Sequence, residues 1–425
     1  MFDFDMLGLS PTLMTALKKS GFKEPTPIQN QAIPLALDGH DILGLAQTGT
    51  GKTLAFGLPL IEHLLALHGK PDPKTAKALI LAPTRELANQ IADSLRAFTT
   101  GTPLKVQVVV GGQSINAQIK RLDRGTDILV ATPGRLIDLM DRGAVKLHTV
   151  QHLVLDEADQ MLDMGFIHAL RRIAPKLGTP RQTMLFSATM PKQMEELSSA
   201  YLTNPRRVQV APPGKAADKV TQSIHFMEKP AKPAKLREIL SRDPEALTLV
   251  FARTKHGAEK LMKGLVADGF NAASIHGNKS QGQRDRAIKA FRDGQIKTLV
   301  ATDVAARGID IPGVAYVINF DLPDVPDNYV HRIGRTARAG LEGEAITLCS
   351  AEEIDLLKQV EKVMKLEIPV AGGTRPAAVK SDKPRRGGGG GGQRRRGPGG
   401  GNGQAGKPQG NTGSRKPRRP RRHAA

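Results

Sequence analysis

The sequence has no tryptophan and a single cysteine among its 425 residues, and aromatic side chains make up only 4% of it. Because 39% of the residues are hydrophobic, any cores must be built mainly from aliphatic side chains. One cysteine, Cys349, excludes an internal disulfide and is typical of a reducing compartment. It lies in the apolar run 345–349, which favours a small buried side chain over a nucleophile.

Long apolar runs are also missing. No stretch approaches the ~20 apolar residues that a membrane-spanning helix needs. Residues 1–5 lack the basic start and the apolar segment of a secretion signal. The sequence therefore predicts a soluble, cytoplasmic protein without a membrane partner.

Acidic residues are outnumbered, with 41 Asp and Glu against 62 Lys and Arg, which gives a formal net charge of +21. Residues 371–425 hold 15 of these cations and one acid, Asp382, so residues 1–370 keep a net charge of +7. An excess in both parts favours a polyanionic partner. The tail could serve only for solubility, but the arginine clusters at 394–396 and 418–422 favour contact with nucleic acid.

The chain is too long for one domain, and its pattern predicts two α/β domains. Short apolar segments that read as buried strands alternate with amphipathic segments such as 85–98, which is typical of a parallel sheet covered by helices on both faces. In the first part the expected strands are 41–45, 78–82, 106–110, 127–131, 152–155 and 183–186. In the second part they are 247–251, 271–275, 298–301 and 316–319, with helices over 255–269 and 281–292.

Changes in composition mark the boundaries between the parts. We expect a first domain over residues 1–210, a linker rich in Pro, Gly and small residues at 211–217, and a second domain over 218–370. Residues 371–425 contain 16 glycines and no aromatic side chain, so they cannot bury a core and we expect a disordered tail. Its binding should be electrostatic and indifferent to base sequence, and it holds one Arg-Gly-Gly, at 386–388.

Residues 46–53 form a glycine-rich turn between an expected strand and an expected helix. Backbone N–H groups in such a turn, together with the helix dipole, favour bound phosphate. Lys52 can reach β- and γ-phosphates, and the Thr53 hydroxyl can bind Mg²⁺. The sequence thus predicts a nucleoside triphosphate site formed by Ala46, Gln47, Thr48, Gly49, Thr50, Gly51, Lys52 and Thr53. A plain connecting turn is the alternative for this segment alone.

The run Asp156-Glu157-Ala158-Asp159 follows the expected strand 152–155, downstream of the phosphate loop. With the other motifs described here, it resembles the DEAD-box ATP-dependent RNA helicases over residues 1 to about 370, and the bacterial RhlE-like group within them. This family begins its phosphate loop with Ala, as at Ala46. The resemblance implies two tandem RecA-like domains, ATP and Mg²⁺ as cofactors, and RNA-stimulated ATP hydrolysis.

Residue chemistry and the resemblance together suggest roles in the first domain. Asp156 would hold Mg²⁺ through water, and Glu157 would orient and deprotonate the attacking water. Asp159 would bond Ser187 or Thr189, a contact that by resemblance couples the nucleotide site to strand separation, and His331 is placed in the same coupling set.

The segment 21–29 resembles the family's Q motif, and it predicts the base specificity. An amide can bond adenine at N6 and N7, so Gln29 is the expected reader of ATP. Phe22 and Phe4 would pack against the base. Alternatively, both phenylalanines are ordinary core residues.

The run 331–340 carries the expected arginine fingers. Arg335 and Arg338 are three residues apart, which would place them on one face of a helix. By resemblance they reach the γ-phosphate when ATP and RNA together close the two domains. Ala337 stands where glycine is commoner in the family, and we expect no loss of chemistry because Ala is a good helix former. Asp303 would lie near the ribose.

Candidate RNA contacts follow strands in both domains. Glycines allow close backbone approach, threonine hydroxyls can bond phosphate, and arginines add charge. These residues are Pro83, Thr84, Arg85, Gly111, Gly112, Thr132, Pro133, Gly134 and Arg135 in the first domain and Arg253, Gly277 and Thr302 in the second. Each of the first-domain segments could instead be a plain turn.

The expected activity is an ATP-dependent RNA helicase that opens short duplexes locally or remodels RNA–protein complexes. A DNA helicase on the same scaffold, or a non-enzymatic RNA clamp that uses nucleotide as a latch, is the alternative. Backbone and 2′-hydroxyl contacts would explain RNA binding without base reading, and nothing in the sequence resembles a dedicated folded specificity domain. The cellular target stays open between ribosome precursors, RNA-decay complexes and cold-shock transcripts.

Overall fold

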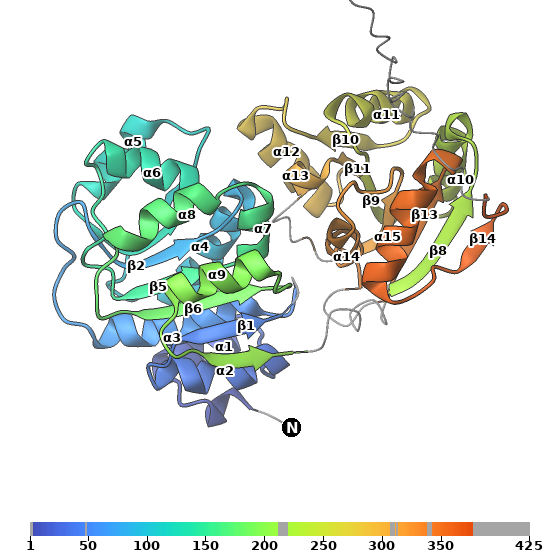
Figure 1. The fold of residues 1–425 in the computed structure, drawn as a ribbon. Coiled ribbons are helices and arrows are strands. Elements are labelled where there is room, and N and C mark those ends of the chain that lie inside the picture. The colour runs from blue at the N-terminus through green and yellow to red at the C-terminus, as the bar shows by residue number, and fades with distance from the viewer. Residues whose placement is uncertain are drawn as a thin grey trace, which may run out of the picture. The chain divides into compact units, whose positions relative to one another are not determined.

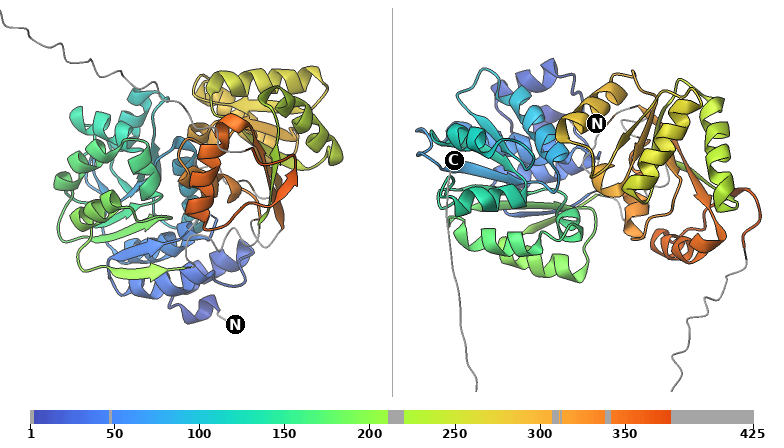
Figure 2. Two further views of the ribbon diagram at one scale, coloured as in Figure 1. Left: turned by 45° about the vertical axis from the view of Figure 1, so that its right-hand side comes forward. Right: turned by 90° about the horizontal axis from the view of Figure 1, so that it is seen from above.

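The computed structural model describes residues 3–46, 49–210, 220–306, 311, 313–337 and 342–376. These residues form two seven-stranded sheets in which every strand pair is parallel (Figure 1). Helices cover both faces of each sheet, as the further views show (Figure 2). The expected α/β class with two RecA-like sheets is confirmed. The expected linker at 211–217 lies outside the described residues.

The first sheet has the strand order β3-β4-β2-β5-β6-β1-β7. Its strands are β1 (Ile42–Leu45), β2 (Ala76–Leu81), β3 (Val106–Val109), β4 (Thr126–Ala131), β5 (His152–Leu155), β6 (Gln182–Ser187) and β7 (Arg206–Gln209). Its helices are η1 (Phe4–Met6), α1 (Pro11–Lys19), α2 (Pro27–Leu37), α3 (Lys52–Ala66), α4 (Arg85–Thr99), α5 (Ile115–Leu122), α6 (Pro133–Asp141), α7 (Ala158–Asp163), α8 (Ile167–Ile173), η2 (Ala174–Lys176) and α9 (Lys192–Tyr201).

Alternation along the strands explains why this sheet is covered twice. Ala78 and Ile80 of β2 pack in a core with α1 to α4, whereas Leu79 and Leu81 pack in a second core with α6 to α9. Successive side chains of a strand point to opposite faces, so a strand that is apolar at every position must be buried on both. The aliphatic composition of the chain supplies such strands.

The second sheet has the order β10-β11-β9-β12-β13-β8-β14, which repeats the order of the first sheet strand for strand. Its strands are β8 (Val220–Phe226), β9 (Leu247–Phe251), β10 (Ala272–Ile275), β11 (Thr298–Ala301), β12 (Val314–Asn319), β13 (Gly343–Cys349) and β14 (Val370–Gly372). Its helices are η4 (Lys229–Ala231), α10 (Lys232–Arg242), α11 (Lys255–Ala267), α12 (Gln281–Arg292), α13 (Asp303–Ala306), α14 (Asp327–Ile333), η5 (Ala351–Glu353) and α15 (Ile354–Met364).

The expected strands do not include β7 of the first sheet or β8, β13 and β14 of the second; β7 and β14 lie at one edge of their sheets. β7 has the sequence Arg-Arg-Val-Gln, and β14 has only three residues and ends in glycine, so neither carries an apolar run. β14 pairs with β8, and Arg375 beyond it donates a hydrogen bond to Glu367 Oε1 (2.6 Å). The second sheet domain therefore extends past residue 370, where the sequence predicts the start of the tail. The rest of the expected tail, from residue 377, lies outside the described residues.

Cys349 is fully buried at the end of β13, as expected, and burial raises the pKa of its thiol to about 12. Among the described residues, no helix combines the length and the apolar character that a membrane crossing requires.

Candidate functional site

The glycine-rich turn between β1 and α3 lies against the amide of Gln29. Gly51 is the N-cap of α3 and has a φ of 90°, a left-handed conformation that glycine adopts without steric cost. Gln29 Nε2 donates to Gly51 O (3.0 Å), and a Cβ on Gly51 would lie only 2.5 Å from that nitrogen. Glycine is therefore required here for both reasons. Gln47 and Thr48 lie outside the described residues.

The amide of Gln29 is fixed at both ends, because its Oε1 also accepts the backbone N–H of Thr26 (2.9 Å). An amide oxygen has a second lone pair and an amide nitrogen a second hydrogen. The side chain can therefore still accept one hydrogen bond and donate another, which is what the edge of adenine at N6 and N7 requires.

Phe4 and Phe22, the expected base contacts, have different surroundings. Phe4 is 2% exposed and packs in the same core as α1 and α2. The structure thus gives Phe4 the core position that was its alternative. Phe22 is 42% exposed, and its ring centroid lies 6.1 Å from that of Phe98, so one side of the ring faces solvent.

Lys52 and the carboxylates after β5 form a buried charge cluster. Lys52 Nζ lies 3.7 Å from Asp156 Oδ1, and both side chains are almost fully buried. Asp156 Oδ1 also accepts the backbone N–H of Glu157 (2.9 Å). Burial raises the pKa of Asp156 to about 6, against the opposing effect of Lys52 and with a further contribution from Glu157. Lys52 thus brings one positive charge to a buried site that holds two neighbouring carboxyl groups, those of Asp156 and Glu157.

Glu157 has φ 52° and ψ 50°, a left-handed conformation that is unusual for a residue other than glycine. It is the N-cap of α7 and is 2% exposed. Backbone strain of this kind costs about 1–3 kcal/mol and persists where surrounding structure enforces it, often at functional sites. The strain is consistent with selection for the direction of this carboxylate.

The residues present fit a Mg²⁺ ion. Asp156 and the half-buried Thr53 offer hard oxygen ligands, and a divalent cation would offset the negative charge around Asp156. No group of three or more His, Cys, Asp or Glu side chains converges as a metal cage among the residues that the structure describes. Mg²⁺ usually keeps several waters and binds phosphate together with one or two carboxylates, and Asp156 would supply one of these.

Asp159 connects the end of β5 to the end of β6. Its Oδ2 accepts the backbone N–H groups of Ala188 (3.0 Å) and Thr189 (2.9 Å) and the Thr189 hydroxyl (3.1 Å). Ser187 Oγ donates instead to Thr189 O (2.7 Å), and Ser187 O accepts the N–H of Ala46 at the start of the phosphate loop (3.0 Å). Of the two expected partners of Asp159, the structure selects Thr189.

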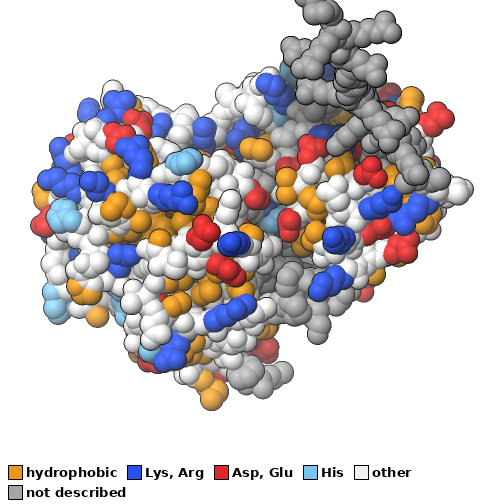
Figure 3. All heavy atoms as spheres, in the orientation of Figure 1, with side chains coloured by type: hydrophobic (Ala, Val, Ile, Leu, Met, Phe, Trp, Pro, Cys, Tyr) orange, Lys and Arg blue, Asp and Glu red, His pale blue; other side chains and the backbone are white. Residues whose placement is uncertain are grey.

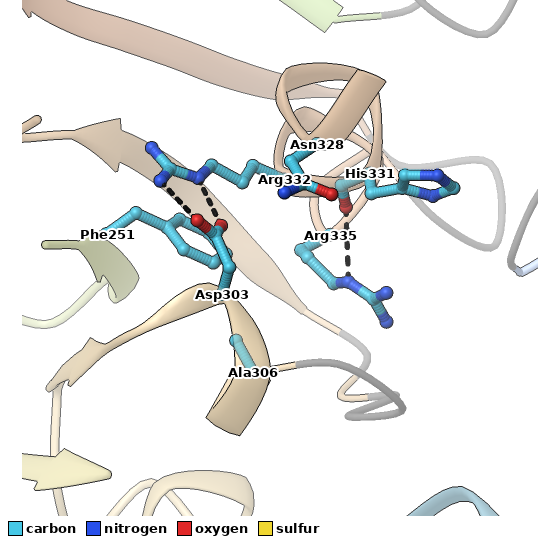
Figure 4. Close-up of a pocket in the computed structure, with 7 residues that line it drawn as sticks. All are labelled: Phe251, Asp303, Ala306, Asn328, His331, Arg332 and Arg335. Carbon is cyan, nitrogen blue, oxygen red and sulfur yellow. Dashed lines mark hydrogen bonds and ion pairs between the residues drawn. The ribbon is translucent and has the colours of Figure 1, made fainter. Parts of the chain in front are cut away.

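In the second domain, Asp303 lies in a small pocket with Arg332 (Figure 4). Arg332 Nε and Nη2 donate to the two oxygens of Asp303 at 2.5 and 2.8 Å, and Nη1 donates to Asn319 Oδ1 (3.1 Å). The guanidinium also lies 4.9 Å from the ring centroid of Phe251. Asp303 is thus held by a buried arginine, and His331 lines the same pocket with its ring pointing away from the Asp303–Arg332 pair (Figure 4).

The expectation that Arg335 and Arg338 share a helix face is wrong. α14 ends at Ile333, and Arg335 follows in a turn, with its Nε donating to His331 O (3.2 Å). Ala337 has a φ of 53°, so the backbone here is left-handed. The expectation that a good helix former is suited to this position fails for the same reason. Arg338 lies outside the described residues.

The candidate RNA contacts of the first domain meet at the carboxyl ends of neighbouring strands β3, β4 and β2. Arg85, after β2, extends over the two glycines after β3, and a Cβ on Gly112 would lie 1.9 Å from Arg85 Nη1. Arg135, after β4, donates to Gln113 O (3.1 Å). Two separate sequence motifs thus form one surface with the guanidinium groups of Arg85 and Arg135.

The threonines and proline of this surface have structural contacts of their own. The Thr84 hydroxyl accepts the N–H of Leu87 (3.2 Å) and caps α4, and Thr132 is the N-cap of α6 with Pro133 in the first turn. Gly134 is exposed, and Pro83 is buried. Helix capping therefore accounts for the hydroxyl of Thr84, whereas the Thr132 hydroxyl makes no capping hydrogen bond.

In the second domain, Arg253, Gly277 and Thr302 follow β9, β10 and β11, which are also neighbours in their sheet. Gly277 is exposed, and Thr302 lies at the start of α13. Arg253 Nη2 is bonded to Glu353 Oε1 (2.8 Å) and Leu322 O (3.3 Å), so much of its hydrogen-bonding capacity is used within the domain.

Sequence reasoning missed Arg332 and Asn319, which hold Asp303. Arg332 lies beside His331 in the motif in which the sequence predicts arginine fingers only at Arg335 and Arg338. Nothing in the neighbouring sequence indicates that Arg332 is buried, with 2% of its surface exposed. The signal that could have found it is the charge of Asp303, a carboxylate directly after a buried strand that needs a cation.

Two domain families match this chain: DEAD/DEAH box helicase over residues 26–197 and helicase conserved C-terminal domain over residues 231–340. The ATP-dependent RNA helicase CshA of Limosilactobacillus reuteri is 44% identical over 383 residues, which cover 89% of this chain and 75% of that protein.

Solved structures are similar over most of the chain. S. cerevisiae Dbp5 bound to RNA and ADP BeF3 matches with a TM-score of 0.79 and 31% identity, covering 88% of this chain and 96% of that one. Mss116p bound to ssRNA and AMP-PNP matches with a TM-score of 0.78 and 28% identity, covering 88% and 79%.

Proposed function

Since this chain belongs to the DEAD-box family of ATP-dependent RNA helicases, we propose that Glu157 orients and deprotonates the water that attacks bound ATP. The observation that carries the proposal is the buried cluster of Lys52, Asp156 and Glu157 at the carboxyl ends of β1 and β5. A buried carboxylate beside a phosphate-binding lysine has the position that general-base chemistry on a phosphoanhydride requires.

The other groups of the site bind and orient the nucleotide. Gln29 reads the adenine edge, backbone N–H groups of residues 49–51 and Lys52 bind the phosphates, and Phe22 packs on the base. Asp156 and Thr53 would hold Mg²⁺, which supplies charge neutralisation at the phosphates when bound. Arg335 and Arg338 neutralise the charge that develops on the transferred phosphoryl group.

Coupling to RNA runs through Asp159 and the Ser187–Thr189 segment. The strands that carry the ATP site and those that carry the RNA surface are neighbours in one sheet, and Asp159 fixes the segment after β6 directly to the segment after β5. We infer that nucleotide-dependent changes at Asp156 and Glu157 pass through this contact to the RNA surface. His331 contributes from the second domain.

RNA is bound through its backbone. Arg85, Arg135 and the exposed glycines would supply charge and close backbone approach to phosphates and sugars, so the protein should open short duplexes locally and without sequence preference. We also propose a cytoplasmic protein that acts on ribosome precursors or RNA-decay complexes, and assignment to the RhlE-like group stays a prediction.

The test is the variant Glu157→Gln, which keeps the size of the side chain and removes the base. We expect binding of ATP and RNA within about twofold of wild type and a turnover lower by about 10²–10⁴, the usual contribution of a general base. The matched control is Glu196→Gln, an exposed glutamate on α9, which should turn over normally. Wild-type turnover in Glu157→Gln would refute the role of Glu157.

The same assay separates the alternatives to an RNA helicase. ATP hydrolysis by the wild type is measured with a panel of RNAs and with DNA of the same sequences. Stimulation by DNA as strong as by RNA would favour a DNA translocase, and RNA binding without stimulated turnover would favour a nucleotide-gated clamp.

A further inference from the structure

Glu259, on helix α11, accepts three hydrogen bonds from the segment that follows this helix in the sequence, residues 274–279. Glu259 Oε2 accepts from Ser274 Oγ (2.7 Å), His276 Nε2 (3.0 Å) and Lys279 Nζ (2.9 Å). Ser274 lies in β10, and His276 and Lys279 lie in the turn after it. Glu259 belongs to none of the motifs that the function uses, yet it contacts one of them directly.

The contacts of His276 determine which ring nitrogen carries its proton. The ring is 4% exposed, and its Nδ1 accepts the backbone N–H of Asn278 (3.3 Å). A nitrogen that accepts a hydrogen bond cannot also carry a proton, so the neutral ring must be protonated at Nε2. Nε2 is the atom that faces Glu259, and a carboxylate is the partner that favours this tautomer.

Hydrogen bonds from His276, Ser274 and Lys279 lower the pKa of Glu259 to about 2. The Glu259 side chain is therefore a charged hydrogen-bond acceptor at neutral pH. The neighbouring Lys263 is 3.9 Å from the other carboxylate oxygen and is mostly exposed, so it adds little.

The turn 276–280 is also held by hydrogen bonds at its C-terminal end, where α12 begins. Lys279 N–H donates to His276 O (3.0 Å). Ser280 and Gln283 form a reciprocal capping box that starts α12, with Ser280 N–H donating to Gln283 Oε1 (2.9 Å). Between these two anchors, Gly277 and Asn278 are exposed, and a Cβ on Gly277 would meet nothing within 4 Å. The turn is therefore held by hydrogen bonds at both ends and presents exposed backbone in its middle.

We propose that Glu259 is a positioning residue for RNA binding, which fixes the Nε2–H tautomer of His276 and through it the shape of the turn 276–280. The turn then offers the backbone of Gly277 and Asn278 to the RNA strand in a single geometry. This inference rests on the proposed function, in which Gly277 contacts RNA. Glu259 would then stabilise the RNA-binding surface of the second domain although it lies outside every RNA-contacting motif.

A variant that removes only Glu259 could raise or lower RNA affinity. It would also free the ammonium group of Lys279 from its ion pair, and RNA attracts this positive charge. The test therefore uses the double variant Glu259→Leu/Lys279→Met, which keeps the net charge of the wild type and leaves Nε2 of His276 without an acceptor. We expect the RNA concentration for half-maximal ATPase stimulation to rise about 5–10-fold, the size expected for the loss of roughly one hydrogen bond. Turnover at saturating RNA and the KM for ATP should stay within about twofold.

The matched control is Lys279→Met alone, which leaves the Glu259–His276 hydrogen bond in place and should change the RNA requirement less than about twofold. A second readout is the ¹⁵N spectrum of the His276 ring. It should show the Nε2–H tautomer in the wild type and in Lys279→Met and a mixture of tautomers in the double variant.

Two results would overturn the proposal: a wild-type His276 protonated at Nδ1, or a double variant with altered tautomers and an unchanged RNA requirement. If the double variant does not fold, the wild-type spectrum still decides the first point, and Glu259→Asp, which keeps the charge on a shorter side chain, replaces it in the RNA measurement. Failure of the proposed function would look different, because RNA would then not stimulate the ATPase of the wild type.

Discussion

Ala337 shows how a single backbone angle can matter more than a propensity. In a helix, alanine would be a favourable choice, but the helix ends four residues earlier and Ala337 has a φ of 53°. A left-handed conformation costs a residue with a Cβ roughly 1–2 kcal/mol, whereas glycine adopts it freely. This explains, in physical terms, why glycine is the commoner residue at this position in the family.

We predict that Ala337→Gly raises the free energy of unfolding of the second domain by about 0.5–1 kcal/mol, because relief of the strain exceeds the added entropy of the unfolded chain. Denaturant unfolding checks the value. Gly343→Ala is the comparison of opposite sign, since its Cβ would lie 2.0 Å from Thr336 Oγ1 and 2.6 Å from Ala337 N. A loss of stability in Ala337→Gly would show that the angle is not a source of strain.

At the scale of elements, the strand order separates the ATP-binding residues from the candidate RNA-binding residues along the carboxyl edge of the sheet. In the first sheet, β5, β6 and β1 carry Asp156, Thr189 and Lys52, whereas β3, β4 and β2 carry the arginine and glycine surface. The sequence predicts that each motif follows a strand, because apolar runs and polar turns are local signals. It does not predict the order of the strands, which depends on contacts between distant segments.

The same distinction explains what was missed. Lys52, Gln29 and Asp159 can be singled out from the sequence because they stand in local motifs. The pairing of Arg332 with Asp303 and the ending of α14 at Ile333 depend on packing against other strands, for which a stretch of sequence carries no signal. β14 was missed because three residues cannot show a periodic pattern.

The contact between α4 and the turn after β3 gives a graded prediction. A Cβ on Gly112 would lie 1.9 Å from Arg85 Nη1, whereas a Cβ on Gly111 would lie 3.3 Å from Nη2. Gly112→Ala should displace the mobile end of the Arg85 side chain, and it also adds backbone strain of about 1–2 kcal/mol because Gly112 has a φ of 76°. We expect it to weaken RNA binding about tenfold and Gly111→Ala about twofold, measured by RNA titration. Equal effects of the two variants would contradict this geometry.

At the scale of the whole molecule, charge is distributed in two ways. On the face drawn in Figure 3, Lys and Arg side chains are scattered among acidic and neutral ones. Residues 377–425, by contrast, hold 14 cations and one acid in the sequence. The sequence-independent attraction to RNA should therefore come disproportionately from these residues, and the salt dependence of binding should report them.

The structure fixes where the tail can be removed. A truncation after residue 370 would delete most of β14 and the contact of Arg375 with Glu367, whereas one after Pro376 leaves both intact. Each tail cation paired with phosphate contributes about 0.7 to the slope of log K against log salt for a single strand, so four such pairs would add about 3. We predict that the chain ending at Pro376 binds RNA more weakly and with a slope shallower by about this amount, while its ATPase without RNA is unchanged. The chain ending at residue 370 should also unfold at lower denaturant, which separates the loss of charge from the loss of an edge strand. If removal of residues 377–425 leaves the salt slope as it was, the cations that bind RNA must lie in the two sheet domains.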